Sequence, residues 1–392
     1  MKLIKSIKKW FKNNRGIVVF IFFTVLIWRV GLIILAWLGL RLIPLRTGYL
    51  GGEAGPYWAN PLLWSWANFD GVHYLSIAQR GYYQFQQAFF PLYPYLIRYL
   101  NPFFKNYLYT GLFISHLSLI TALFLFYELV KLDYQKKVAR RSLLYLLLFP
   151  TAFFFVSVYT ESLFLALVLG SFYAAKKKNW WLAGILGGLA SSTRFVGIFL
   201  FPALLVEWFL QNEKKEKKNI SEIIWQGLPL FFIATGLLFY MAYLKETTGD
   251  PLYFIHVQPF FGAGRTGGKI ILLYQVFWRY FKMLITVQKL TPTYFVVVLE
   301  SLTAVFFVFL TIFAYLRRWF AYLTFMALAF IVPTLTGTFS SLPRYALVLF
   351  PGFILLAIWG EKYRWVRILY PAIAIPLLIL SVLLFTRGYF VA

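Results

Sequence analysis

The sequence contains no cysteine and few histidines or acidic residues. With no cysteine in 392 residues, disulfides, thiolate nucleophiles and cysteine-ligated metals are excluded. The three histidines, His73, His116 and His256, are far apart in the sequence, which argues against a histidine metal site. We therefore predict no cofactor and name no metal-ligating residue, while the sequence leaves metal dependence open. Only 13 acidic residues accompany 38 basic ones, so each carboxylate near an apolar segment stands out.

The composition is that of a membrane protein. Hydrophobic residues make up 61% of the chain and charged residues only 13%, whereas soluble domains are about half apolar and a quarter charged. The formal charge of +25 could suggest a nucleic-acid partner. The basic residues, however, lie in short clusters between apolar runs, which is typical of the cytoplasmic loops of a multi-span protein. We predict membrane lipid, and no nucleic acid, as a partner.

The alternation of apolar runs and basic clusters predicts an all-α polytopic membrane protein, a single domain over residues 1–392, with about 11 transmembrane helices. The basic segment Met1–Arg15 before an apolar run predicts an uncleaved signal anchor with a cytoplasmic N-terminus. The expected spans are Gly16–Leu40, Tyr107–Val130, Ser142–Val158, Leu163–Ala175, two short helices within Trp180–Leu210 that turn near Arg194, Ile223–Leu244, Pro292–Leu316, Trp319–Leu335, Tyr345–Gly360 and Ile368–Phe385.

Two long loops, 41–106 and 245–291, are predicted on the non-cytoplasmic side. The first contains GVHYLSIAQR, an amphipathic sequence that predicts an interfacial helix. The second holds several basic residues, which such a long loop tolerates because long loops translocate largely regardless of charge. Ionisable residues beside apolar spans are costly and often functional. Those that this topology places together at the outer face are Asp70, Glu161, Arg194, Asp250 and Arg344.

Each of these residues also has a purely structural interpretation. Asp70 could cap the helix that follows it, Glu161 could occupy a favourable first turn, and Asp250 lies in the turn sequence TGDP. Arg344 could extend to lipid headgroups or pair with Glu161. It could instead lie in the first turn of a helix capped by Ser341, where free N–H groups and a guanidinium would together bind an anion.

One motif resembles a known family. The segment FDGVHYLSIAQRGY, followed by AFFPLYP, resembles the first-loop signature of the GPI mannosyltransferase II (PIG-V) family, with Phe69 where that family usually has tryptophan. Four later segments match further blocks of the family in the same order, so that the resemblance covers most of the chain. These segments are LFPTAFFFVSVYTESLFLAL, GLASSTRFVGI, GDPLYFIHVQ and SSLPRYALVLFP.

The resemblance implies a GT-C glycosyltransferase that uses a polyprenyl-phosphate sugar, with mannose as the expected sugar, on the non-cytoplasmic face. The acceptor would be a lipid- or glycan-linked hydroxyl, and transfer would invert the anomeric centre. Asp70 would be the catalytic base, while cations would stabilise the leaving phosphate. A prokaryotic source implies the plasma membrane and a eukaryotic source the endoplasmic reticulum. The expected substrate-binding and donor-binding residues are His73, Tyr74, Glu161, Arg194, Asp250 and Arg344.

Two other functional classes remain open from the sequence. A lipid or solute transporter, or a flippase, would place charges and broken helices near the membrane midplane, and the helix break near Arg194 is compatible with this. A scaffold subunit of a glycan-assembly complex would need no catalytic residue. The location of the acidic and basic residues on one side, next to a large outer loop, favours the enzyme.

Overall fold

The computed structural model describes residues 2–48, 50–51, 54–213 and 225–391, with side chains from Asn14 onward except at residue 54. All regular structure in these residues is α-helical or 3-10 helical. The lysine-rich loop at 214–219, predicted to be cytoplasmic, and the basic side chains before Asn14 lie outside this description.

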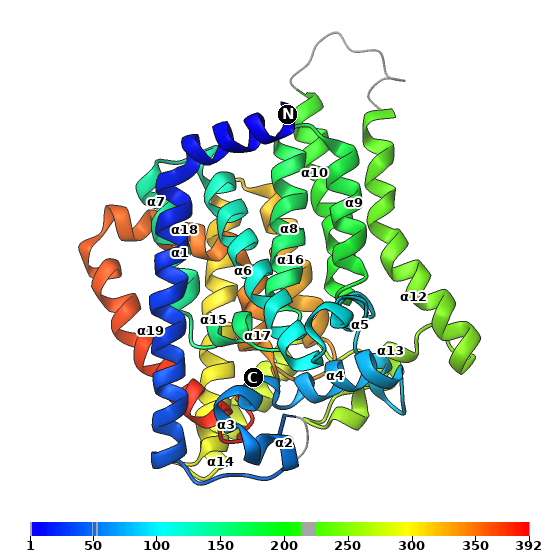
Figure 1. Ribbon diagram of the computed structural model, residues 1–392, viewed down its shortest axis with the longest axis vertical. Helices are drawn as coiled ribbons and strands as arrows, with labels where there is room; N and C mark the ends of the chain where they lie inside the picture. Colours follow the sequence, from blue (N-terminus) through cyan, green and yellow to red (C-terminus); the bar gives the residue numbers. More distant parts are fainter. Residues whose placement is uncertain (1, 49, 52–53, 214–224, 392) are drawn as a thin grey trace.

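The body of the molecule is a bundle of long helices that run roughly side by side (Figure 1). A buried apolar cluster extends through it, with α6 packed against α8 and α8 against α9. The helices of the bundle are α1 (Lys2–Leu42), α6 (Tyr107–Lys131), α7 (Lys136–Leu148), α8 (Glu161–Lys176), α9 (Trp180–Ser191), α10 (Leu200–Glu213), α12 (Phe232–Thr248), α15 (Pro292–Leu316), α16 (Phe320–Thr334), α18 (Phe350–Lys362) and α19 (Arg364–Phe385).

Six segments of the described chain are long and apolar enough to cross a membrane, or up to seven if the bent pair at 342–362 counts as one span. Nearly every predicted span has a matching helix, but the count of 11 is not confirmed. Several matching helices, among them α9 with 12 residues and α16 with 15, are shorter than the roughly 20 residues that a straight span needs. The six are Asn14–Leu42, Tyr107–Lys131, Phe195–Glu213, Trp225–Thr248, Pro292–Leu316 and Arg364–Phe385.

Side-chain caps explain why two of these helices begin where the sequence predicts. The Asn106 carboxamide accepts a hydrogen bond from the Tyr109 N–H at 3.1 Å, just before α6. Thr291 caps α15 in the same way through the Tyr294 N–H, at 3.2 Å. Each cap satisfies one of the N–H groups that the first turn of a helix leaves unpaired.

The predicted hairpin near Arg194 is present. Helix α9 ends at Ser191, a 3-10 turn spans Phe195–Phe199, and α10 returns through the bundle. Helix α12 packs closely on α9, since a Cβ on Gly236 would lie 2.1 Å from the Gly188 carbonyl oxygen. Small residues at such a crossing allow two helix backbones to approach closely.

The remaining helices gather at one end of the bundle, the lower end in Figure 1. The sequence predicted α4 as an interfacial helix, but its Leu75 and Ala78 are buried and the helix packs against α5. Protein, not lipid, therefore covers most of its apolar face. The helices of this end are α2 (Ala54–Ala59), α3 (Pro61–Trp64), α4 (Asp70–Arg80), α5 (Leu92–Phe104), α13 (Tyr253–His256), α14 (Leu273–Thr286) and α17 (Leu342–Tyr345).

Candidate active site

The backbone that carries Asp70 is anchored by its neighbour Asn68, which is fully buried. The Asn68 amide donates to the Phe385 carbonyl at 2.9 Å, and its side-chain oxygen accepts from the Gly51 N–H at 2.7 Å. Its backbone carbonyl accepts from the Tyr159 hydroxyl at 2.8 Å. Segments distant in sequence thus fix the position at which α4 begins.

Phe69 adopts an unusual backbone conformation, with φ at +57°. A bulky residue rarely occupies this region, and it costs on the order of 1–3 kcal/mol. The ring packs against Phe385 and Phe390, with centroids 5.9 and 5.7 Å away. Asp70 is consequently the first residue of α4 rather than its cap, and its side chain faces the cavity described below.

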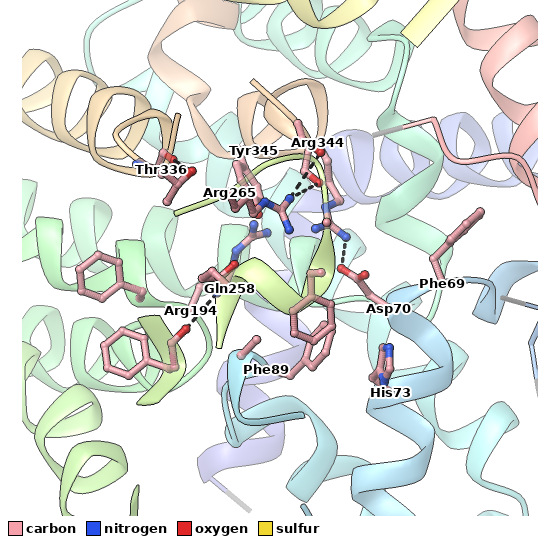
Figure 2. Close-up of a pocket in the computed structure, with 18 of the residues that line it drawn as sticks. Phe69, Asp70, His73, Phe89, Arg194, Gln258, Arg265, Thr336, Arg344 and Tyr345 are labelled. Carbon is pink, nitrogen blue, oxygen red and sulfur yellow. Dashed lines mark hydrogen bonds and ion pairs between the residues drawn. The ribbon is translucent and has the colours of Figure 1, made fainter. Parts of the chain in front are cut away.

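Asp70 is paired with Arg344, which comes from the opposite part of the sequence (Figure 2). The Arg344 Nη1 donates to Asp70 Oδ2. Burial alone would raise the pKa of the Asp70 carboxyl, but the Arg344 guanidinium, helped by His73 and Arg265, holds that pKa below its usual range. Asp70 is therefore an anion at neutral pH.

Glu161 lies between two arginines. It is only 1% exposed and begins α8. Its Oε1 accepts from Arg194 Nη1 at 2.7 Å and lies 3.5 Å from Arg344 Nε. The Arg194 guanidinium also lies over the Tyr345 ring, 4.9 Å from its centroid. The predicted residues Asp70, Glu161, Arg194 and Arg344 thus form one connected cluster.

His73 and Tyr74 follow Asp70 on the first turn of α4. The His73 ring stacks on Phe89 with centroids 4.9 Å apart, and burial lowers its pKa despite the nearby Asp70. His73 is therefore neutral at neutral pH. Tyr74 is buried, and its ring makes an edge contact with Phe89, 5.1 Å between centroids. Both residues line the same cavity as Asp70.

Two sequence interpretations of the Arg344 region differ from the structure. Ser341 precedes α17 but makes no capping hydrogen bond through its side chain, and α17 has only 4 residues. So short a helix presents no extended N-terminal anion site. Arg344 pairs with both Asp70 and Glu161 instead, so the structural alternative of a pair with Glu161 describes part of its contacts.

Asp250 lies away from this cluster. Its Oδ1 accepts from the Leu252 N–H at 2.9 Å, and its Oδ2 is 2.5 Å from His256 Nδ1. The hydrogen bond from His256 lowers the pKa of Asp250. The described lining of the cavity includes neither residue. The structural interpretation of TGDP, a turn stabilised by its own aspartate, therefore accounts for Asp250.

The cluster opens into a cavity of about 930 Å³. Phenylalanines from several segments form much of its wall, including Phe89, Phe195 and Phe261. The two carboxylates in the lining, Asp70 and Glu161, are outnumbered by the cations Arg46, Arg194, Arg265, Lys269 and Arg344. The cavity is thus suited to a ligand with apolar parts and negative charge. Among the described residues, no group of three His, Asp or Glu side chains could hold a metal ion.

Three residues of the site were not identified from the sequence as functional. Asn68 and Tyr159 are neutral residues that act through the backbone, and no pattern distinguishes them. Arg265 was counted only as a basic residue of the second outer loop. Its segment, GAGRTGG, is rich in glycine and carries a single arginine. This pattern is the sequence feature that could have identified Arg265 as a functional residue.

Comparison with known proteins supports a broad functional class. Residues 88–240, less than half of the chain, match the profile of the dolichyl-phosphate-mannose-protein mannosyltransferase family. The matched segment contains Glu161 and Arg194 but not Asp70, Arg265 or Arg344. It supports a membrane glycosyltransferase of the GT-C type, whereas the resemblance to the GPI mannosyltransferase II family stays a prediction. No curated protein matches the chain.

Two solved structures are similar, both of the oligosaccharyltransferase from Archaeoglobus fulgidus. The apo form has 14% sequence identity and a TM-score of 0.45, covering 93% of this chain. The form tethered to an acceptor peptide containing the NVT sequon has 15% identity and a TM-score of 0.45, covering 97% of this chain. The matched region is 56% of that enzyme in each case, so this chain corresponds to little more than half of its length.

Proposed function

We propose that this protein is an integral-membrane glycosyltransferase that transfers a sugar, mannose, from a polyprenyl-phosphate donor to a hydroxyl of a lipid- or glycan-linked acceptor. One observation carries the proposal. An ionised carboxylate, Asp70, faces a large cavity with phenylalanines in its wall, in which cations outnumber carboxylates. The phenylalanines complement an apolar lipid tail, the cations complement a phosphate, and the Asp70 carboxylate complements a hydroxyl nucleophile.

The proposed reaction is a single displacement with inversion. The acceptor hydroxyl attacks the anomeric carbon, and the bond from this carbon to the phosphate oxygen breaks. Its electron pair stays on the phosphate, while the hydroxyl proton passes to Asp70. The products are the glycoside, polyprenyl monophosphate and a protonated Asp70, so atoms and charge balance.

The low pKa of Asp70 suits a late proton transfer. A carboxylate held anionic by Arg344 is a weak base toward a free hydroxyl. The acceptor proton becomes acidic only as its oxygen bonds to the anomeric carbon. Asp70 therefore orients the nucleophile first and removes its proton as the leaving bond breaks.

The arrangement of charges favours this reaction over transport. A transporter would place its binding residues near the midplane, where broken helices of the two halves meet. In this chain the helix break near Arg194 and the carboxylates of Asp70 and Glu161 lie together with the loop elements at one end of the bundle. A site at the end of the bundle would let the acceptor hydroxyl enter from the water side while a lipid-borne donor enters from the membrane.

The direct test is a transfer assay. Membranes containing the protein receive radiolabelled polyprenyl-phosphate mannose, and label is measured in the lipid and glycan fractions. Asp70→Asn should lower turnover by a factor of roughly 10²–10⁴, the usual scale for a general base. Asp133→Asn, an exposed aspartate outside the cavity, is the matched control and should be unchanged. Near-normal turnover by Asp70→Asn would refute the role of Asp70 as the base, and no transfer of label by the wild type would refute the proposed reaction.

The side of the membrane is tested separately. Basic loops bracket the opposite end of the bundle, which predicts that the cavity opens to the non-cytoplasmic side. Reporter fusions after Tyr57, Ser162 and Ser341 should be active outside, and those after Lys137, Lys177 and Arg318 inside. A cytoplasmic signal from any of the first three would exclude a site at one outer face.

A further inference from the structure

Arg265 lines the same cavity and lies beside Arg194 and Arg344 of the cluster. Among the described residues, no Asp or Glu lies within ion-pair distance of its guanidinium, whereas Arg194 and Arg344 are both paired. In the described part of the chain, the hydrogen bonds of the Arg265 guanidinium go to hydroxyls, with Nη2 at 3.5 Å from Ser340 Oγ and 3.3 Å from Ser341 Oγ. Figure 2 shows its guanidinium beside those of Arg194 and Arg344.

The glycine loop, defined here as residues 262–271, holds Arg265 in this position. Its first three residues, Gly262, Ala263 and Gly264, all have positive φ, a conformation that glycine adopts without cost. The Arg279 guanidinium fixes this turn by donating to the Ala263 carbonyl at 3.0 Å and to the Gly337 carbonyl at 2.9 Å.

Backbone hydrogen bonds tie the glycine loop to the segment that carries Arg344. The Thr266 N–H donates to the Thr336 carbonyl and the Ile271 N–H to the Leu335 carbonyl, each at 2.9 Å. Buried Glu300 holds the same segment by accepting from the Ser341 N–H at 3.3 Å. Arg265 and its two hydroxyl neighbours therefore form a pre-organised group rather than part of a loose surface loop.

The charge of the cluster indicates which anion fits. Of the five cations in the cavity lining, Arg46 and Lys269 are exposed to solvent. The three less exposed guanidinium groups (Arg194, Arg265, Arg344) and the two carboxylates (Asp70, Glu161) leave one positive charge. The phosphodiester of a polyprenyl-phosphate sugar carries one negative charge, whereas a diphosphate link carries two. A lipid monophosphate donor thus neutralises the cluster.

We propose that Arg265, with the hydroxyls of Ser340 and Ser341, binds the phosphate of the donor, and that Arg344 instead holds Asp70. This assignment rests on the proposed glycosyl transfer. During that reaction one negative charge moves from Asp70 to the leaving phosphate. Arg265 interacts with the phosphate more strongly as this charge grows, and an interaction that strengthens in the transition state raises the rate.

The test is equilibrium binding, which does not depend on catalysis. Purified protein in phosphatidylcholine nanodiscs is titrated with sugar-free polyprenyl phosphate. Arg265→Gln should weaken binding by roughly tenfold to a hundredfold, the scale of a hydrogen bond to a charged group. Arg265→Lys should fall between, because lysine lacks the planar fork. Arg141→Gln, which alters an arginine at the opposite end paired with Glu361, is the control and should bind like the wild type.

Further measurements distinguish the donor from other sources of phosphate. They also distinguish the Arg265 assignment from the proposed glycosyl transfer. Phosphatidylglycerol in the nanodisc, or added inorganic phosphate, should displace the probe only weakly; displacement by either at comparable concentration would overturn the donor assignment.

Asp70→Asn should still bind the probe. If the wild type transfers mannose while Arg265→Gln binds the probe normally, the Arg265 assignment fails and the glycosyl transfer stands. If Arg265→Gln loses binding while Asp70→Asn turns over normally, the phosphate site stands and the proposed base fails.

Discussion

The two ends of the helix bundle use charge in opposite ways. At the end away from the cavity, ion pairs are simple one-to-one contacts: Lys131 with Glu128 at 2.6 Å, Arg141 with Glu361 at 3.0 Å and Lys176 with Glu207 at 3.1 Å. At the cavity end, Asp70 and Glu161 pair with the guanidinium groups of Arg194 and Arg344, Arg344 contacts both carboxylates, and the side chains are more deeply buried. Pairs of the first kind stabilise helix ends weakly, because their side chains are partly exposed.

The cavity end keeps a charge that its own residues do not neutralise. An excess cation beside apolar helices costs free energy, and folding alone gives no reason to retain it. A ligand that carries a negative charge would explain why the excess cation is retained. Perturbing matched residues at the two ends should therefore separate stability from function.

The largest difference between the two ends is expected in the free energy of unfolding when a buried glutamate is replaced at each end. Glu161→Gln removes the carboxylate shared by two arginines, and breaking a buried pair costs about 3–5 kcal/mol. Glu207→Gln keeps hydrogen-bonding capacity opposite Lys176, whose side chain is 25% exposed, and should cost about 1 kcal/mol. Denaturant unfolding of both variants in detergent measures the two free energies. Equal losses would remove the distinction between the ends.

The next largest difference is expected in turnover, when Arg344 at the cavity end and Arg141 at the opposite end are each replaced by lysine. Arg344→Lys should weaken the contacts with Asp70 and Glu161, because the compact ammonium of lysine lacks the planar fork whose Nη1 and Nε face the two carboxylates. Turnover should fall by roughly tenfold to a hundredfold, the range expected when a charged hydrogen bond of about 1.5–3 kcal/mol is lost. Arg141→Lys, at the opposite end, should transfer sugar at the wild-type rate. The two variants are compared at saturating acceptor over a range of donor concentrations, and equal rates would exclude a role for Arg344 at Asp70.

The pH dependence sharpens the role of Arg344. The catalytic form of Asp70 is the anion, so activity is present above the pKa of Asp70 and is lost as pH falls through it. Because Arg344 lowers this pKa, the acidic limb of the wild-type profile should lie below the usual range of aspartate. Arg344→Gln should move the limb to higher pH. A profile of kcat/KM in which the two limbs coincide would show that the pair does not control the base.

Much of the fold follows from sequence pattern. Nearly every predicted span has a helix because the apolar runs are bounded by local signals such as Asn106 and Thr291, whose caps need only a few neighbouring residues. The number of membrane spans is harder to predict from the sequence, because the bend of 76° at 342–362 depends on tertiary packing. The burial of α4 under α5 likewise depends on contacts that periodicity does not reveal.

The candidate site was predictable where the residue itself is unusual. Asp70, Glu161, Arg194 and Arg344 are charges beside apolar runs, and the structure brings all four together. Which pairs with which was not predictable, because Asp70 and Arg344 are separated by 274 positions. Arg265 was missed because a long basic loop offers several equivalent cations, and only the folded glycine loop shows that Arg265 and Lys269 reach the cavity.

The smallest effect is expected for Asp250. Its carboxylate pairs with exposed His256 and caps its own turn at the Leu252 N–H, outside the described lining of the cavity. Asn forms the same kind of turn, so Asp250→Asn should change kcat/KM by less than about twofold and stability by less than about 0.5 kcal/mol, as for other surface substitutions. The transfer assay and the unfolding measurement used for Glu161 check both values. A large loss of turnover with unchanged stability would instead place the second outer loop, through Asp250, in contact with a substrate.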